Sequence, residues 1–286
     1  MNSLNREYYS IRTGRSSDLK QIDFELLKDL FRAIYQEFVR NDYFFEAFGF
    51  KCVDSGFNPG IAGENIDIFF FRKLRKRNLW PIEEKSSHFS EDDLFDVIEL
   101  LYDLVSKPIE GYYHNYCGCG QHWTKFDKIS GQTEFREEIN HILRDYEGGY
   151  ILSENGEILI IGKDGVKDLF EVEISTSEPE KIDDKIRYAI NKYRKYHASF
   201  EEKVESIRIL AGVLEYIRSR VKLVLSRKDE GSLFEIANNY SIRHSNDGQK
   251  EFENPAFLDW IFTMYLSTIY LTFGISVKEE SDSLEN

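Results

Sequence analysis

Cysteine is scarce in this sequence, which has three in 286 residues: Cys52, Cys117 and Cys119. An odd number of thiols cannot form a framework in which every cysteine is paired. The Cys117–Cys119 spacing is also too short for a usual structural disulfide. A fold held together by disulfides is therefore excluded.

Long apolar runs are also missing. No run approaches the roughly 18 apolar residues that a membrane-spanning helix needs. The first residues, MNSLNREYYSIRTGR, lack the apolar core of a signal peptide. We therefore expect a cytoplasmic protein without membrane contact.

Positive charge is the third quantity in short supply. With 37 Lys and Arg against 51 Asp and Glu, the net charge is -14. This balance argues against a broad nucleic-acid-binding surface, which depends on clustered cations, but it leaves room for a local one. The sequence has two basic runs that could form such a surface. Basic runs are more often solvated helix faces than binding sites. The first comprises Arg72, Lys73, Arg75, Lys76 and Arg77, and the second comprises Arg187, Lys192, Arg194 and Lys195.

The composition is otherwise that of a folded protein, with 41% hydrophobic and 15% aromatic residues. A chain of this length suits two modest domains. The segment VEISTSEPE, residues 172–180, is rich in Glu, Ser, Thr and Pro and is typical of a linker. We therefore expect an N-terminal domain over 1–171, a linker over 172–180, a second domain over 181–276 and an acidic tail over 277–286.

Apolar spacing predicts a mostly helical N-terminal domain of the α+β class. In residues 43–63, glycines interrupt any regular spacing of apolar residues, which indicates a packed loop. Asn155-Gly156 tolerates the positive φ angles of a type I′ turn, which predicts a β-hairpin over 150–161. The expected helices are 23–40, 65–78, 90–106, which opens with the capping-box pattern Ser90-Glu91-Asp92-Asp93, and 131–146.

Beyond the linker, each apolar pattern has a helical period. The expected helices are 182–197, 201–225, 232–240 and 255–273. Four helices with one apolar face each predict a four-helix bundle. The whole chain is thus expected to be mainly α.

One stretch, HNYCGCGQH, combines metal-ligand residue types. His114, Cys117, Cys119 and His122 match the ligand types and the ligand number of a tetrahedral zinc site. Cys-x-Cys, however, is a tight spacing for two ligands of one ion. The alternative is a glycine-broken loop that packs its Cys, His and Trp123 into the core. A cysteine nucleophile is less favoured, because the sequence specifies no base for it.

No P-loop, dinucleotide fingerprint, HExxH or GxSxG motif occurs, so no nucleotide cofactor is indicated. A polar segment, 243–250, lies between the last two predicted helices. Its adjacent Arg243 and His244 could stabilise charge on a phosphate and move a proton at the neighbouring 2′-hydroxyl, as in metal-free RNA cleavage. The alternative is a surface turn in which Arg243 pairs with a carboxylate.

The sequence LFEIANNYSIRH, followed by NDGQK and FLDWIFTMYLSTIY, resembles the C-terminal HEPN domain of bacterial abortive-infection proteins. Upstream, EAFGFKCVDSGFNPG, CGCGQHW and FDKISGQTEFREEINHILRDY resemble the N-terminal region of the same proteins. The resemblance runs from about residue 43 to 271. It implies a HEPN-like four-helix bundle that pairs into a homodimer, in a cytoplasmic antiviral defence protein related to toxin–antitoxin systems.

Many HEPN domains are metal-independent ribonucleases whose signature is an Arg, a polar residue and a His a few positions later. Arg243 and His244 match the first two positions, whereas Gly248, Gln249 and Lys250 occupy the places where the final His would stand. The resemblance thus implies either a variant ribonuclease or a non-catalytic bundle that binds a partner protein of a defence system. In the first case Arg243 and His244 are catalytic. RNA contacts are then expected at Asn246, Gln249, Lys250, Arg72, Arg75 and Arg77.

Overall fold

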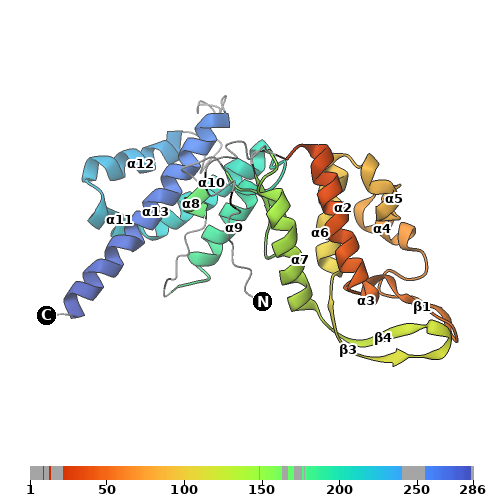
Figure 1. Cartoon of the computed structure of the whole chain (residues 1–286). Coiled ribbons are helices and arrows are strands. Elements are labelled where there is room, and N and C mark those ends of the chain that lie inside the picture. Colours follow the sequence, from red (N-terminus) through yellow and green to blue (C-terminus); the bar gives the residue numbers. More distant parts are fainter. Residues whose placement is uncertain are drawn as a thin grey trace. The chain divides into compact units, whose positions relative to one another are not determined.

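The computed structural model describes residues 9, 13, 22–147, 149–162, 167–170, 176, 178–239 and 255–284. Side chains are described for these residues except 167, 168, 237–239, 255 and 275–284. The chain forms two compact units, Met1–Ile158 and Leu159–Asn286. Figure 1 labels their elements, which are mainly helices with small two-stranded sheets. The mainly α class predicted from the sequence is confirmed.

Three helices form the body of the first unit: α2 (Phe24–Arg40), α6 (Glu91–Leu104) and α7 (Lys128–Leu143). Each begins where a side chain accepts a backbone N–H of the first turn, at Asp23, Ser90 and Asp127 respectively. The capping box predicted at Ser90 is confirmed, because Asp93 also accepts the Ser90 N–H. The apolar spacing located all three helices, but the third was predicted over 131–146 and lies three residues earlier, because Asp127 caps it.

The apolar faces of α2, α6 and α7 meet in one core, and the three helices lie side by side in Figure 1. Phe31 of α2, Ile98 of α6 and Phe135 of α7 are fully buried. Removing such side chains from water is the main stabilising contribution to this unit.

The segment 43–63, predicted to be a packed loop, contains regular structure instead. It forms α3 (Phe45–Phe48) and an antiparallel hairpin of β1 (Phe50–Cys52) and β2 (Gly56–Asn58). Gly49 has φ 75° and ψ -172°, a conformation reserved for glycine, and it turns the chain from α3 into β1. The loop prediction was wrong because these glycines separate short elements.

The next elements are α4 (Ile66–Leu74), α5 (Ile82–Lys85) and a 3₁₀ turn (Ser86–His88). The helix predicted over 65–78 is confirmed in its first part only. Arg75 adopts the left-handed conformation, with φ 59°, and ends α4 there.

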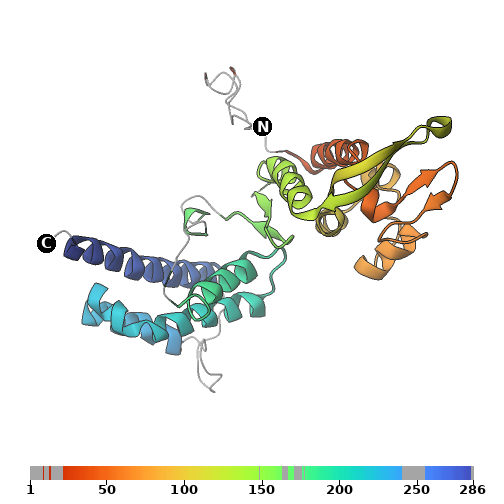
Figure 2. The same cartoon turned by 90° about the horizontal axis from the view of Figure 1, so that it is seen from below.

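A long hairpin occupies 107–127, where the sequence indicated no strand. Strand β3 (Lys107–His114) pairs antiparallel with β4 (Gly120–Asp127), and the 3₁₀ turn Tyr116–Gly118 connects them. Both views show this hairpin extending away from the helices (Figures 1 and 2). Tyr112, Tyr113 and Tyr116 are exposed on it, so the usual alternation of apolar and polar residues is absent.

The hairpin predicted over 150–161 is confirmed as β5 (Tyr150–Leu152) and β6 (Ile158–Ile160). Its turn, however, is not type I′. Only Gly156 of the Asn-Gly pair has positive φ, at 81°. The N–H of Gly156 donates to the Ser153 carbonyl and the N–H of Ser153 to the Glu157 carbonyl, the pattern of a turn followed by a glycine bulge.

The second unit is helical and contains α8 (Lys167–Phe170), α9 (Asp183–Arg194), α10 (Phe200–Tyr216), α11 (Arg218–Val224), α12 (Arg227–Asn239) and α13 (Pro255–Leu284). The single helix predicted over 201–225 is in fact two. Ile217, with φ -93° and ψ 14°, separates α10 from α11. Helix α13 continues to Leu284, through most of the predicted acidic tail.

Helices α9, α10 and α13 pack around a common core. The ring of Tyr193 stacks on Phe262 at 3.9 Å between centroids, and its hydroxyl donates to Asp259 at 2.6 Å. A HEPN-type four-helix arrangement stays a prediction for this unit.

Helix α13 contains a long apolar span. Its span Ala256–Gly274 is long and apolar enough to cross a membrane by length and composition, which the sequence prediction did not anticipate, and 44% of that window is buried in the unit. A core helix of a soluble protein has the same properties. The hydroxyls of Thr263, Ser267 and Thr268 each donate to the carbonyl four residues earlier.

The boundary between the units lies after Ile158, earlier than the predicted linker 172–180. Leu159 forms a β-bridge with Lys195, and the Ile160 carbonyl accepts from Arg194 at 2.7 Å. These contacts tie the residues after the boundary to the helical unit. Of the predicted linker, residues 172–175 and 177 lie outside the described part.

Candidate functional site

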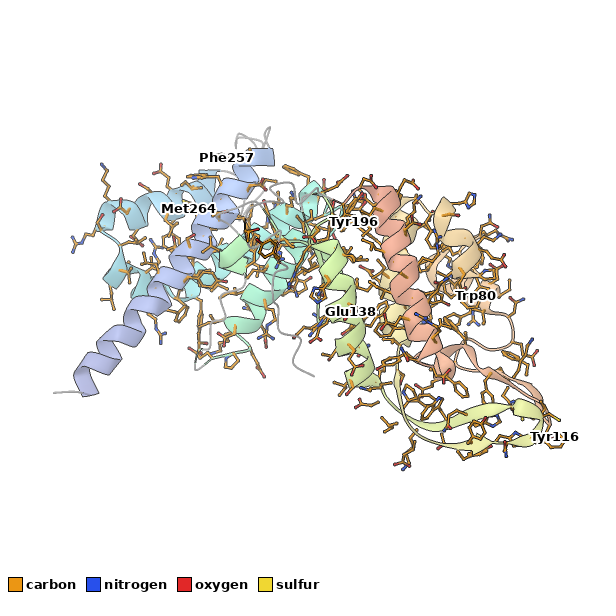
Figure 3. The ribbon with its side chains drawn as sticks, in the orientation of Figure 1. Trp80, Tyr116, Glu138, Tyr196, Phe257 and Met264 are labelled. Atoms are coloured by element: carbon orange, nitrogen blue, oxygen red, sulfur yellow. The ribbon has the colours of Figure 1, made fainter. Side chains whose placement is uncertain are left out.

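Four side chains of the first unit that can bind a metal lie together at the ends of the β1–β2 and β3–β4 hairpins. Cys52, His114, Cys119 and His122, together called the Cys/His cluster below, have ligand atoms that all lie within 4.8 Å of one another. Tyr116, labelled in Figure 3, marks the tip of the β3–β4 hairpin where three of the four residues lie. Residues far apart in sequence thus form one site.

Backbone structure places each member of the cluster. Cys52 ends β1 and precedes the turn into β2, His114 ends β3, and His122 lies in β4 opposite Tyr112. Cys119 follows the 3₁₀ turn and directly precedes β4. The two hairpins meet here, since the Phe50 and His122 rings are 4.6 Å apart.

The sulfur and nitrogen atoms face one another in pairs. Cys119 Sγ lies 3.1 Å from His122 Nε2, and Cys52 Sγ lies 3.8 Å from His114 Nδ1. His122 is buried and the other three members are half-buried. The site is therefore neither fully enclosed nor fully exposed.

The outer nitrogen of each histidine has an oxygen neighbour. Tyr112 Oη lies 3.2 Å from His122 Nδ1, and Asp54 Oδ2 lies 3.3 Å from His114 Nε2. An oxygen at the outer nitrogen favours the tautomer that directs a lone pair inward, toward the sulfurs.

The two cysteines of the cluster differ in acidity. Hydrogen bonds from the backbone of Ser55 and Asp54 lower the pKa of the Cys52 thiol to about 6. A backbone hydrogen bond from Val53 lowers the pKa of Cys119, but burial and the neighbouring Cys52 outweigh it and the net pKa is raised. The backbone around Cys52 thus favours the thiolate form more than the surroundings of Cys119 do.

Of the predicted zinc ligands, His114, Cys119 and His122 lie in the cluster and Cys117 does not. Cys117 is exposed and adopts φ 48° inside the connecting turn. Cys52 stands in its place, contributed by the other hairpin. The sequence pointed to Cys52 only indirectly. Two cysteines in a Cys-x-Cys spacing are too close to bind one ion easily, and Cys52 is the one further cysteine in the sequence.

The first basic run spans the end of α4 and the residues that follow it, and it divides into one paired cation and four others. Lys76 reaches Asp96 at 2.7 Å and Asp93 at 3.1 Å. Burial lowers the pKa of Lys76, but hydrogen bonds to these two carboxylates outweigh that effect and raise it. The remaining four, called the basic turn below, are Arg72, Lys73, Arg75 and Arg77.

All four side chains of the basic turn are exposed, and within the described residues no carboxylate lies at ion-pair distance from them. Lys73 and Arg77 instead lie over the Phe69 and Phe71 rings, at 5.8 and 4.9 Å from the centroids. The predicted contacts Arg72, Arg75 and Arg77 thus share one accessible turn.

The second basic run makes internal contacts. Arg187 lies 3.7 Å from Asp184, Lys192 lies 2.5 Å from Glu205, and Arg194 donates to a backbone carbonyl of its own unit. These cations act in the structure of the helical unit.

The predicted catalytic pair Arg243 and His244, and the predicted contacts Asn246, Gln249 and Lys250, lie outside the described residues. The described chain on either side of them is helical, in α12 and α13, as expected. The roles assigned to these five residues stay predictions.

Comparison with known proteins adds no assignment: no protein-family model matches this chain, and no curated protein or solved structure matches it either. The chemistry of the site therefore rests on the residues and distances given above.

Proposed function

We propose that this chain is a cytoplasmic bacterial defence protein of the abortive-infection type that binds RNA and cleaves it without a metal. The observation that carries the proposal is the basic turn: four exposed cations without a carboxylate partner in the described part of a chain whose net charge is -14. In so acidic a protein, unpaired cations concentrated in one turn favour a polyanionic ligand.

Cleavage is proposed for the polar segment 243–250, on the basis of the resemblance to HEPN domains. Arg243 would stabilise the charge on the phosphate, because its guanidinium is always charged and donates two hydrogen bonds in one plane. His244 would move the proton of the 2′-hydroxyl near neutral pH. Asn246, Gln249 and Lys250 would orient the RNA.

The alternative proposal is a non-catalytic protein whose helical unit binds a partner of the defence system. It is favoured by the sequence itself, since Gly248, Gln249 and Lys250 stand where the second histidine of the family would be. Glutamine can donate and accept hydrogen bonds but cannot take up a proton at neutral pH. In either case the homodimer through the helical unit stays a prediction.

The first test is incubation of the purified protein with total bacterial RNA and tRNA in magnesium-free buffer, with and without EDTA. The expected result is cleavage in both buffers. Arg243→Ala and His244→Ala are each expected to reduce the rate by about 10²–10⁴-fold, the usual contribution of one acid–base or charge-stabilising group. Gel electrophoresis of the RNA measures the rates.

Arg187→Ala is the control for that test, because Arg187 is an exposed cation of the same unit that pairs with Asp184. It should cleave at the wild-type rate. If the wild type and all variants leave the RNA intact, the result favours the alternative, a non-catalytic protein that binds a partner. If Arg243→Ala and His244→Ala still cleave RNA at the wild-type rate, the activity does not lie in segment 243–250.

A second test concerns the basic turn. In an Arg243→Ala background, chosen to slow cleavage, Arg75→Ala with Arg77→Ala should weaken binding of a labelled single-stranded RNA. The slope of log affinity against log salt should become shallower by about 0.7 for each phosphate that the variant no longer neutralises. Fluorescence anisotropy over a salt series measures both quantities.

Lys125→Ala is the matched control, since Lys125 is an exposed cation of the same unit that pairs with Glu110 at 2.6 Å. It should leave the affinity and the salt dependence unchanged. If the basic-turn variant behaves like this control, RNA does not bind at the basic turn.

A further inference from the structure

We infer that the Cys/His cluster binds one zinc ion through two sulfur and two nitrogen ligands, and that this ion joins the β1–β2 hairpin to the β3–β4 hairpin. The inference goes beyond the proposed function and does not depend on it. It also changes the ligand set expected from the sequence, because Cys52 replaces Cys117.

The distances fit a tetrahedral zinc ion. With Zn–S bonds of about 2.3 Å and Zn–N bonds of about 2.0–2.1 Å, the edges of the ligand tetrahedron are about 3.3–3.8 Å long. The Cys119–His122 and Cys52–His114 sulfur–nitrogen distances are 3.1 and 3.8 Å, and every pair of ligand atoms lies within 4.8 Å. Side-chain adjustments of about 1 Å or less would complete the tetrahedron.

The ligand types and their surroundings select zinc. Two thiolates with two imidazoles suit zinc better than hard cations, which prefer oxygen ligands. Asp54 and Tyr112 lie at the outer nitrogens of His114 and His122, as second-layer groups do in zinc sites. These groups hold the imidazoles in the orientation that metal binding requires.

The two hairpins need an additional connection. Strands β1 and β2 have three residues each, and among the described residues β3 pairs with β4 and with no other strand. Two-stranded hairpins are marginally stable in water. Exposed Tyr112, Tyr113 and Tyr116 contribute little burial to the longer one. A metal bound by residues of both hairpins adds a cross-link to the Phe50–His122 contact that already joins them.

The ligand number also indicates what the ion does. Four protein ligands close the coordination sphere and leave no position for a substrate or an activated water. The zinc is therefore structural, and RNA cleavage elsewhere in the chain does not depend on its chemistry.

Cys117 provides a matched control within the same turn, because it is exposed and lies outside the cluster. The experiment compares wild type, Cys52→Ser and Cys117→Ser, each equilibrated with zinc and then freed of excess metal. Elemental analysis should find about one zinc per chain in wild type and Cys117→Ser, and much less in Cys52→Ser.

Two measurements on wild type and Cys117→Ser keep the inference testable if Cys52→Ser fails to fold. Replacement of zinc by cobalt should give the visible bands of tetrahedral cobalt and the near-ultraviolet bands of thiolate ligands, with equal intensity in both proteins. A thiol reagent should titrate one cysteine rapidly in the metal-loaded wild type, and all three after chelation and denaturation.

Zinc well below one per chain in the wild type, after equilibration with the metal, would overturn the inference. Loss of zinc or of thiolate bands in Cys117→Ser, with full zinc content in Cys52→Ser, would restore the ligand set expected from the sequence. Neither outcome bears on RNA cleavage, whose assay has its own variants.

Discussion

Replacing Phe135 with alanine is expected to lower the free energy of unfolding of the first unit by about 3–5 kcal/mol. Phe135 is fully buried in α7. Its ring meets those of Phe38 and Phe44 nearly edge to face, with centroids 5.2 and 6.2 Å away. The substitution removes these contacts and leaves a cavity that the surrounding residues can fill only in part.

Denaturant unfolding followed by tryptophan fluorescence measures this loss. Trp80 and Trp123 lie in the first unit and Trp260 in the second, so a Trp260→Phe background isolates the first unit. Phe135→Leu is the graded control, because it keeps most of the apolar volume and should cost less than alanine. An unchanged midpoint for Phe135→Ala would mean that this ring does not belong to the cooperative core.

Gly49→Ala is the second substitution for which we expect a large effect, a loss of about 2–5 kcal/mol. A methyl group on Gly49 would lie 2.1 Å from the Asn58 carbonyl oxygen and 2.7 Å from the Gly60 backbone nitrogen. The backbone at Gly49 is also in a region that side chains rarely adopt, with φ 75°. Both effects push β1 away from β2.

Gly56→Ala separates these two contributions. Gly56 belongs to the same hairpin and has φ 74°, but a methyl group there would meet nothing within 4 Å. It should therefore cost only the backbone strain, about 1–2 kcal/mol. Thermal unfolding by circular dichroism compares the two variants, and equal losses would show that the close approach at Gly49 relaxes without cost.

Local signals predicted most of the helical part of the fold. The side chains of Asp23 and Ser90 cap helices whose apolar residues recur every three to four positions, so both elements could be located from sequence. Ile217 carries no such signal. It is neither glycine nor proline, so the break between α10 and α11 could not be read from the sequence.

The strands were harder to predict for a physical reason. Alternation identifies a strand when one face is buried and the other is wet. In β3, Ile109 and the adjacent Tyr112 and Tyr113 are all exposed, so the alternation is lost. In β1 and β2 the strands are too short for any period to appear.

The Cys/His cluster was predicted in part, because three of its members lie within nine residues of sequence. The fourth, Cys52, stands 62 residues from His114, and only the meeting of two hairpins makes them neighbours. No local pattern encodes that meeting. The short Cys-x-Cys spacing was the one indication in the sequence that Cys117 and Cys119 would not both lie in the cluster.

The hydroxyl groups along α13 have a consequence for how this helix responds to its surroundings. Thr263, Ser267 and Thr268 donate to carbonyls of their own helix, so their hydroxyl hydrogens need no partner outside the helix. Transfer of this segment between water, a protein core and a lipid phase would break none of these three bonds. These three positions therefore carry polar residues whose hydroxyl donors are already satisfied within the helix. A count of residue types does not show this.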